Sequence, residues 1–338
     1  MAGHVADTAA EPGPAVVEAE LPLSPARLLV ASGATPSIAG EVEERGTAQP
    51  EAATGSQAST PPPHPPKRAR LSAPAAPFDA SALELPAPPS RLLGPGERLV
   101  WADEFEYEGL PREDKWEFQV DANNWVHKPS HNEQQWYTSK RLENAHVSGG
   151  KLHICARREA WEGCPFTSAR LRTKGRGDWL YGRIEVCAKL PPARRGLWPA
   201  IWLVSSDNRY GTWPKSGEID IMENLGCEPG VLHGSVHAGA YNHRLHNHQM
   251  RTTRCVDAHD AFHVYSINWT AESIELFVNS EKFFEFKNEH KGSDAWPFDH
   301  PLHLILNVAV GGNWGAKDGI ADDVCPASME IAYVRVYQ

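Results

Sequence analysis

The first 92 residues of this 338-residue chain almost lack aromatic side chains and contain no cysteine. Their one aromatic residue is Phe78, whereas 16 of the 28 prolines of the chain fall in this segment. Such a composition cannot bury enough apolar surface to offset the entropy lost on ordering. We therefore expect a disordered Pro/Ala-rich tail over 1–92 and a single folded domain over 93–338.

The chain also lacks long hydrophobic runs and a strongly basic region. The run Leu28-Leu29-Val30 is much too short for a secretory signal or a membrane span, so neither is expected. The tail has 6 basic and 10 acidic residues, a charge of −4, which leaves −6 of the total −10 to the domain. This balance excludes a binder of polyanions, so nucleic acid is not expected as a partner.

The six cysteines show no zinc-ligand spacing. Six cysteines allow 15 disulfide pairings, and the one that we expect is a bridge closing the loop between Cys227 and Cys255. The His-rich segment 241–248 has no acidic or cysteine partner at ligand spacing. It is therefore predicted to be a solvated loop and not a metal site.

Short alternating segments dominate the chain after residue 99. Apolar and polar residues alternate over 181–190, 274–278 and 332–336, and Gly, Asn, Pro and Asp clusters separate such segments. Long helical periodicity is absent from the sequence. This pattern predicts an all-β fold, a sandwich of two antiparallel sheets of the jelly-roll type with one concave sheet. A cleft across the concave face would admit a polymer in mid-chain, which favours endo cleavage.

The segment Glu218-Ile219-Asp220-Ile221-Met222-Glu223 places three carboxylates in one apolar stretch. In a strand, Glu218 and Asp220 point to one face and the isoleucines to the other. Strict alternation would put Met222, and not Glu223, beside Asp220. We predict a β-bulge that returns Glu223 to the acidic face.

Carboxylates this close repel one another, so one of them should hold its proton at neutral pH. A pair with one ionised and one protonated carboxyl group is what glycosidases use. Three tryptophans, Trp198, Trp202 and Trp213, lie near the acids in the sequence. Flat aromatic faces beside acids suit sugar rings, whose C–H groups stack on them. The pattern predicts a glycosidase site.

These motifs resemble glycoside hydrolase family 16. The residues that carry the resemblance are the segment 217–226, which reads GEIDIMENLG, and the upstream segment 198–204, which reads WPAIWLV. The extra residue Met222 is similar to the laminarinase-like, endo-1,3-β-glucanase branch. The likeness extends from Val100 to Tyr337 and implies a concanavalin A-like lectin/glucanase jelly roll.

Carried over position by position, the resemblance implies a retaining mechanism. It makes Glu218 the nucleophile, Asp220 its assisting partner and Glu223 the general acid/base. Further positions match the substrate cleft of the family, and these are Trp198, Trp202, Trp213, Asn132, Arg170, His237 and Trp314.

The resemblance also raises the question of a structural calcium ion. Many relatives bind calcium on the convex face through an Asp of the final strand, where this chain has Ala332. Ala332 has no side-chain oxygen, and calcium takes six or more oxygen ligands, although Glu104 and backbone carbonyls remain available. We expect no required cofactor and do not favour calcium.

The sequence favours an endo-β-glucanase acting on β-1,3-linked glucan as a monomer, with β-glucan as its partner and no membrane. Two alternatives stay open. One is a non-catalytic glucan-recognition protein, although such proteins lose the acids that are present here. The other is a transglycosylase with the same covalent intermediate. The absence of a signal peptide indicates an intracellular protein, whereas the family analogy indicates an extracellular one.

Overall fold

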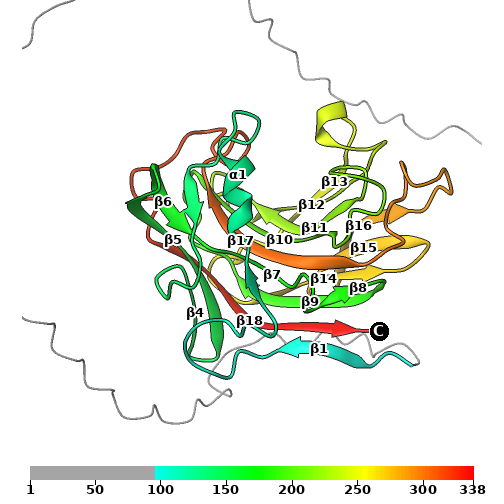
Figure 1. Ribbon diagram of the computed structural model, residues 1–338, viewed down its shortest axis with the longest axis horizontal. Helices are drawn as coiled ribbons and strands as arrows, with labels where there is room; N and C mark the ends of the chain where they lie inside the picture. Colours follow the sequence, from blue (N-terminus) through cyan, green and yellow to red (C-terminus); the bar gives the residue numbers. More distant parts are fainter. Residues whose placement is uncertain (1–95) are drawn as a thin grey trace, which may run out of the picture. The chain divides into compact units, whose positions relative to one another are not determined.

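The computed structural model describes residues 96–338, and the tail predicted over 1–92 lies outside the described residues. The regular secondary structure of the described part is almost entirely β-strand, arranged in two sheets, which confirms the predicted sandwich (Figure 1). Among these residues, no helix has the length and apolar content needed to cross a bilayer.

The first sheet has ten strands and runs in the order β16-β15-β14-β9-β18-β5-β6-β3, with β1 paired to β18 and β4 to β5. Its pairs are antiparallel except β3 with β6. The strands are β1 (Leu99–Asp103), β3 (Gln135–Tyr137), β4 (Ala145–Ser148), β5 (Lys151–Trp161), β6 (Cys164–Ser168), β9 (Gly182–Lys189), β14 (His263–Trp269), β15 (Ser273–Val278), β16 (Glu281–Lys287) and β18 (Ala327–Tyr337).

The second sheet has eight strands in the order β13-β12-β11-β10-β17-β7-β2, with β8 paired to β17. It carries the three acids on β11. The strands are β2 (Glu117–Phe118), β7 (Arg170–Arg172), β8 (Asp178–Trp179), β10 (Leu197–Ser205), β11 (Glu218–Asn224), β12 (Val231–His237), β13 (Gln249–Arg254) and β17 (Leu302–Val310).

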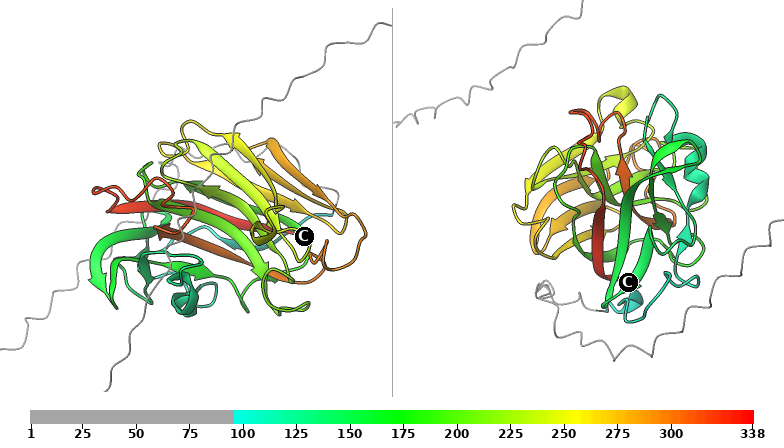
Figure 2. Two further views of the ribbon diagram at one scale, coloured as in Figure 1. Left: turned by 90° about the horizontal axis from the view of Figure 1, so that it is seen from above. Right: turned by 90° about the vertical axis from the view of Figure 1, so that its left-hand side faces the viewer.

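Helical structure in the described part is confined to single turns. These are a 3-10 turn, η2 (Val120–Ala122), the short helix α1 (Asn123–Val126) that follows it, and a second 3-10 turn, η3 (His243–Leu245). In Figure 1, α1 and the yellow turn beside β13 rise at opposite ends of the eight-stranded sheet, on the side away from β18. The views in Figure 2 show the same two curved layers from other directions.

The core lies between the two sheets and is built from alternate residues of each strand. On β11, Ile219, Ile221 and Met222 are all fully buried in it. All nine residues of β17 are buried, because this central strand is covered on both faces. Because both faces are covered, Asn307 is buried although it is polar and lies on the face opposite Leu306. It pairs with Ala200, which in turn pairs with Glu223.

Replacing Ile219 tests how much this core supports the acidic strand. Ile219→Ala should lower the free energy of unfolding by about 2–5 kcal/mol, because the buried side chain leaves a cavity behind the acids. Urea unfolding measures the change. Val256 is 81% exposed, so Val256→Ala is a matched control that should stay within about 0.5 kcal/mol of wild type. Equal losses in the two variants would contradict the packing described.

Candidate active site

A β-bulge in β11 brings the three acids to one face, as the sequence predicted. Against β10, Trp202 pairs with Asp220 and Ile201 with Met222, so Ile221 is the extra residue. Against β12, the register also shifts between Asp220 and Glu223. Because Ile221 and Met222 both turn into the core, Glu223 returns to the side of Glu218 and Asp220.

Strand β12 places a polar residue opposite each acid. Glu218 pairs with His237, Asp220 with Ser235 and Glu223 with His233. The Ser235 hydroxyl donates a short hydrogen bond to Asp220 Oδ2. Ser235 and His233 were not predicted from the sequence, although residues 233, 235 and 237 alternate with Gly234 and Val236. That alternation is the signal that would have found them.

Each glutamate has its own indole donor. Trp213 Nε1 donates to Glu218 Oε2 at 3.1 Å, and Trp198 Nε1 donates to Glu223 Oε1 at 3.0 Å. Both tryptophans were predicted to bind sugar, and both are half-buried here. Their rings therefore reach the acids directly, and their N–H groups favour the ionised carboxylates.

His237 lies between two of the acids. Its Nε2 is 3.4 Å from Asp220 Oδ2 and 3.7 Å from Glu218 Oε1, and the side chain is 9% exposed. Burial lowers the pKa of His237, but the hydrogen bond with Asp220 and the charges of Glu218 and Asp220 outweigh it and raise the pKa to about 9. The imidazolium is thus a counter-charge within the acidic cluster.

The two glutamates hold protons more tightly than ordinary carboxyl groups. Burial and the neighbouring Asp220 raise the pKa of Glu218 to about 8, against the opposing effect of His237. Burial, Asp220 and Glu218 raise the pKa of Glu223 well above its usual range. His237, Arg170 and Trp213 all favour the charge of Glu218, whereas the charges of both Asp220 and Glu218 oppose that of Glu223, so we assign the first ionisation to Glu218 and the retained proton to Glu223.

Buried Arg170 stacks on half-buried Trp202 beside the acids. The Arg170 guanidinium lies 4.5 Å from the ring centroid of Trp202 and 5.0 Å from that of Trp125, and its Nε donates to Gln119 at 2.7 Å. Trp202 Nε1 donates to Asn307 Oδ1 at 2.8 Å. Arg170 is only 4% exposed, and its charge opposes the rise in the pKa of Glu218.

Asn132 and Trp314 lie on neighbouring loops at the other end of β10. Asn132 is exposed, and its backbone carbonyl accepts a hydrogen bond from Gly312 N at 3.0 Å. The Trp314 ring meets the Trp198 ring edge-on, with centroids 5.5 Å apart. Both predicted residues are therefore near the Glu223 end of the site.

The His-rich segment 241–248 is only partly the solvated loop that was predicted. Residues 243–247 are exposed, but the His243 ring lies 5.0 Å from the Trp213 ring and His248 stacks on His237 at 5.3 Å. The Arg244 guanidinium lies 4.6 Å from the centroid of Trp213. His243 and Arg244 of this loop thus pack against Trp213, the residue that donates to Glu218. The composition of the loop does not predict this packing.

A comparison with known families adds to this geometry. The model of glycosyl hydrolases family 16 matches residues 113–335. The chain belongs to this family.

Similar proteins and similar solved structures agree with the family 16 assignment. The beta-glucanase of Rhodothermus marinus is 47% identical over 247 residues, covering 71% of this chain and 85% of that protein. The solved laminarinase from Rhodothermus marinus has a TM-score of 0.69 at 46% identity, covering 72% of this chain and 97% of that one. The solved structure of SCLam, a non-specific endo-beta-1,3(4)-glucanase, has a TM-score of 0.69 at 39% identity, covering 78% of this chain and 99% of that one. The predicted family, jelly-roll fold and glycosidase class are confirmed.

The calcium site of many family 16 members does not fit the residues of this chain. Both carboxylate oxygens of Glu104 accept hydrogen bonds from Arg335, at 2.8 and 2.9 Å. Ala332 is buried and offers no side-chain oxygen. A guanidinium thus occupies the carboxylate that would otherwise be free for the ion.

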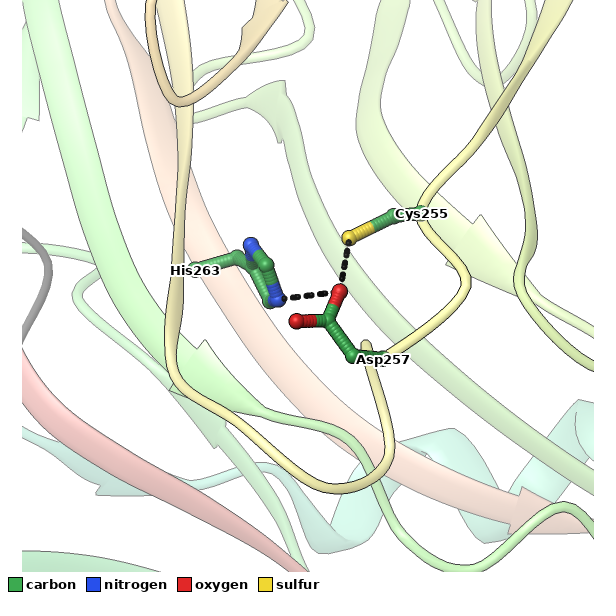
Figure 3. Close-up of side chains that lie close together, drawn as sticks. All are labelled: Cys255, Asp257 and His263. Carbon is green, nitrogen blue, oxygen red and sulfur yellow. Dashed lines mark hydrogen bonds and ion pairs between the residues drawn. The ribbon is translucent and has the colours of Figure 1, made fainter.

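A second cluster, Cys255, Asp257 and His263, has the spacing of metal ligands (Figure 3). His263 Nε2 lies 3.1 Å from Asp257 Oδ1. Asn279 accepts from Val264 N through Oδ1, so its Nδ2 faces His263 Nδ1 as a donor at 3.0 Å. This fixes the His263 proton on Nε2, the nitrogen that would have to bind a metal. The cluster is therefore held by the hydrogen bond from Cys255 to Asp257 and by the close approach of His263 to the same carboxylate.

The predicted Cys227–Cys255 disulfide is wrong, since all six cysteines are free thiols. Cys255 is buried with its sulfur 3.8 Å from Asp257 Oδ1. Burial and Asp257 raise the pKa of the Cys255 thiol to about 12. Cys227 lies instead beside Asp318. The two thiols thus have separate partners. The two segments meet only through the backbone, where Cys255 N donates a hydrogen bond to Gly230 O.

The raised pKa of Glu218 predicts a pH-dependent cost in stability. Folding raises this pKa from 4.5 to about 8, so the folded state binds more protons and loses stability as the pH rises between these values. Glu218→Gln removes the titrating group but keeps an acceptor for Trp213. Thermal unfolding should show a higher melting temperature than wild type, with a larger gain at pH 8 than at pH 5. A gain that shrinks at high pH would contradict the assigned direction.

Proposed function

We propose that this protein is a retaining endo-β-glucanase that cleaves β-1,3-linked glucan. The reaction class, hydrolysis of a glycosidic bond by a family 16 enzyme, follows from family membership. The relatives reported above are a beta-glucanase, a laminarinase and an endo-beta-1,3(4)-glucanase, which supports β-1,3-glucan as the substrate. One observation carries the residue assignment: Glu218 and Glu223 lie on one face of β11, each with its own indole donor.

In the first step of the proposed mechanism, the Glu218 carboxylate attacks the anomeric carbon. The bond from that carbon to the leaving oxygen breaks, and Glu223 gives its proton to this oxygen. The product is a glycosyl ester on Glu218 and an ionised Glu223. The raised pKa of Glu223 suits this role, because the group still carries a proton at neutral pH.

In the second step, a water attacks the same carbon and Glu223 accepts its proton, which releases Glu218. Two inversions leave the anomeric configuration unchanged. Asp220, held by Ser235 and His237, keeps its place between the two glutamates. When Glu218 is esterified its charge is lost, which lowers the repulsion on Glu223 and lets it ionise as the base requires.

The aromatic residues of the site are assigned to the sugar subsites as follows. Trp198 and Trp213 flank the acids, and their half-buried rings offer faces next to the bond that breaks. Trp202 lies farther along β10 on the Arg170 stack. Arg244 and His243 lie against Trp213, so a sugar at that position would contact these loop residues as well as the indole.

The proposal is tested with laminarin, lichenan, agarose and xyloglucan as a substrate panel. Laminarin should be cleaved to oligosaccharides, and proton NMR should show the β-anomer first. Glu218→Gln should lower kcat by about a thousandfold or more while circular dichroism stays native. Glu285→Gln, an exposed acid on β16, is the control and should keep full activity.

The same assays distinguish hydrolysis from the two alternative functions. Binding of laminarin without any product would identify a glucan-recognition protein. Longer products after addition of a short acceptor would identify a transglycosylase. An α-anomer as first product, or near-normal hydrolysis by Glu218→Gln, would overturn the retaining mechanism with Glu218 as nucleophile.

A further inference from the structure

The loop after β17, residues 311–319, packs against the ring of Trp198. A Cβ added to Gly312 would lie 3.0 Å from Trp198 Cζ3, and one added to Gly315 would lie 3.0 Å from Trp198 Cβ and 2.3 Å from Gly311 O. Larger residues at these two positions would push the loop or the indole away. The glycines thus allow the loop to hold the ring whose N–H is bonded to Glu223.

Trp314, in the same loop, links Trp198 to β12. Its ring meets Trp198 edge-on at 5.5 Å and His233 edge-on at 4.9 Å. His233 is buried and lies directly across from Glu223 in the sheet. Glu223 thus has His233 across the sheet and Trp198 as its donor, and Trp314 packs against both of these rings.

Glu228, in the turn between β11 and β12, connects both ends of this arrangement. Its Oε2 is 2.9 Å from His233 Nε2, and its Oε1 accepts a hydrogen bond from Lys317 of the loop. The Lys317 ammonium holds the pKa of Glu228 below its usual range. One carboxylate thus joins the strand that faces Glu223 to the loop that holds Trp198.

We propose that Glu228 is a positioning residue for the general acid/base. By binding His233 and Lys317 together, it fixes Trp314 and through it the Trp198 N–H that orients Glu223. This inference rests on the proposed role of Glu223. Glu228 acts only on the placement of the acid, because none of its contacts reaches Glu218, Asp220 or His237.

The chemical consequence depends on the leaving group. A sugar oxygen is a poor leaving group and needs the proton of Glu223, so a displaced acid slows this step. A 2,4-dinitrophenolate leaves without a proton, so its departure does not depend on the placement of Glu223. The rate of the first step with each substrate separates loss of acid positioning from general damage to the site.

The test compares kcat/KM for laminarin and for 2,4-dinitrophenyl β-laminaribioside, since kcat/KM reports the first irreversible step. Glu228→Ala should lower the value for laminarin about tenfold, a part of the 10²–10⁴ that a general acid contributes. The value for the dinitrophenyl substrate should stay within about twofold of wild type. Equal losses on both substrates, or no loss on either, would overturn the proposal.

Lys317→Met removes the ion pair between Lys317 and Glu228 and leaves Glu228 in place. It replaces Glu228→Ala in the test if that variant does not fold. It should show the same selective loss. The matched control is Glu285→Gln, which removes an exposed carboxylate that also contacts two lysines, Lys282 and Lys287, far from the site. It should leave both values unchanged.

Glu223→Gln on the same two substrates separates this inference from the proposed function. A large loss on laminarin with a small loss on the dinitrophenyl substrate supports Glu223 as the acid. If that variant shows the split and Glu228→Ala does not, the positioning role alone fails. If Glu223→Gln loses both activities equally, the assignment of the acid fails.

Discussion

One extra residue in β11 is the constraint on which the site depends. In a regular strand, a residue five positions after Glu218 faces the opposite side, and a carboxyl group there would be buried in the core among apolar side chains. The bulge at Ile221 sends two consecutive apolar residues inward and returns Glu223 to the outer face. The same irregularity places His233 across from Glu223, so it also sets the contacts of the acid.

Bringing three carboxyl groups together costs free energy, and the surrounding residues offset it selectively. Trp213 and His237 support the charge of Glu218, and Ser235 supports Asp220. Glu223 also has one indole donor, Trp198, but burial and the charges of Asp220 and Glu218 favour its protonated form. The unequal surrounding charges thus set two chemically identical side chains apart, as the proposed roles of nucleophile and acid require.

Short-range patterns carried most of what the sequence predicted. Alternation over 181–190, 274–278 and 332–336 predicted strands, which the structure has at 182–189, 273–278 and 327–337, and the spacing of the acids predicted the bulge. The predicted disulfide between Cys227 and Cys255 was wrong, because the position of each thiol depends on tertiary contacts, such as that of Cys255 with Asp257. The stacking of Arg170 between Trp125 and Trp202 was equally out of reach, since residues from three separate segments form it. Glu228 and Lys317 likewise meet only in the fold.

The assignment of Glu218 as nucleophile is tested most directly by trapping the covalent intermediate. A laminaribiosyl fluoride with a second fluorine at C2 forms the glycosyl ester readily, but this ester is hydrolysed slowly. The labelled protein can therefore be digested and its peptides sequenced by mass spectrometry. The account predicts a single label on Glu218, lost in Glu218→Gln and retained in Glu223→Gln. A label on Asp220 or Glu223, or inactivation without any covalent adduct, would contradict it.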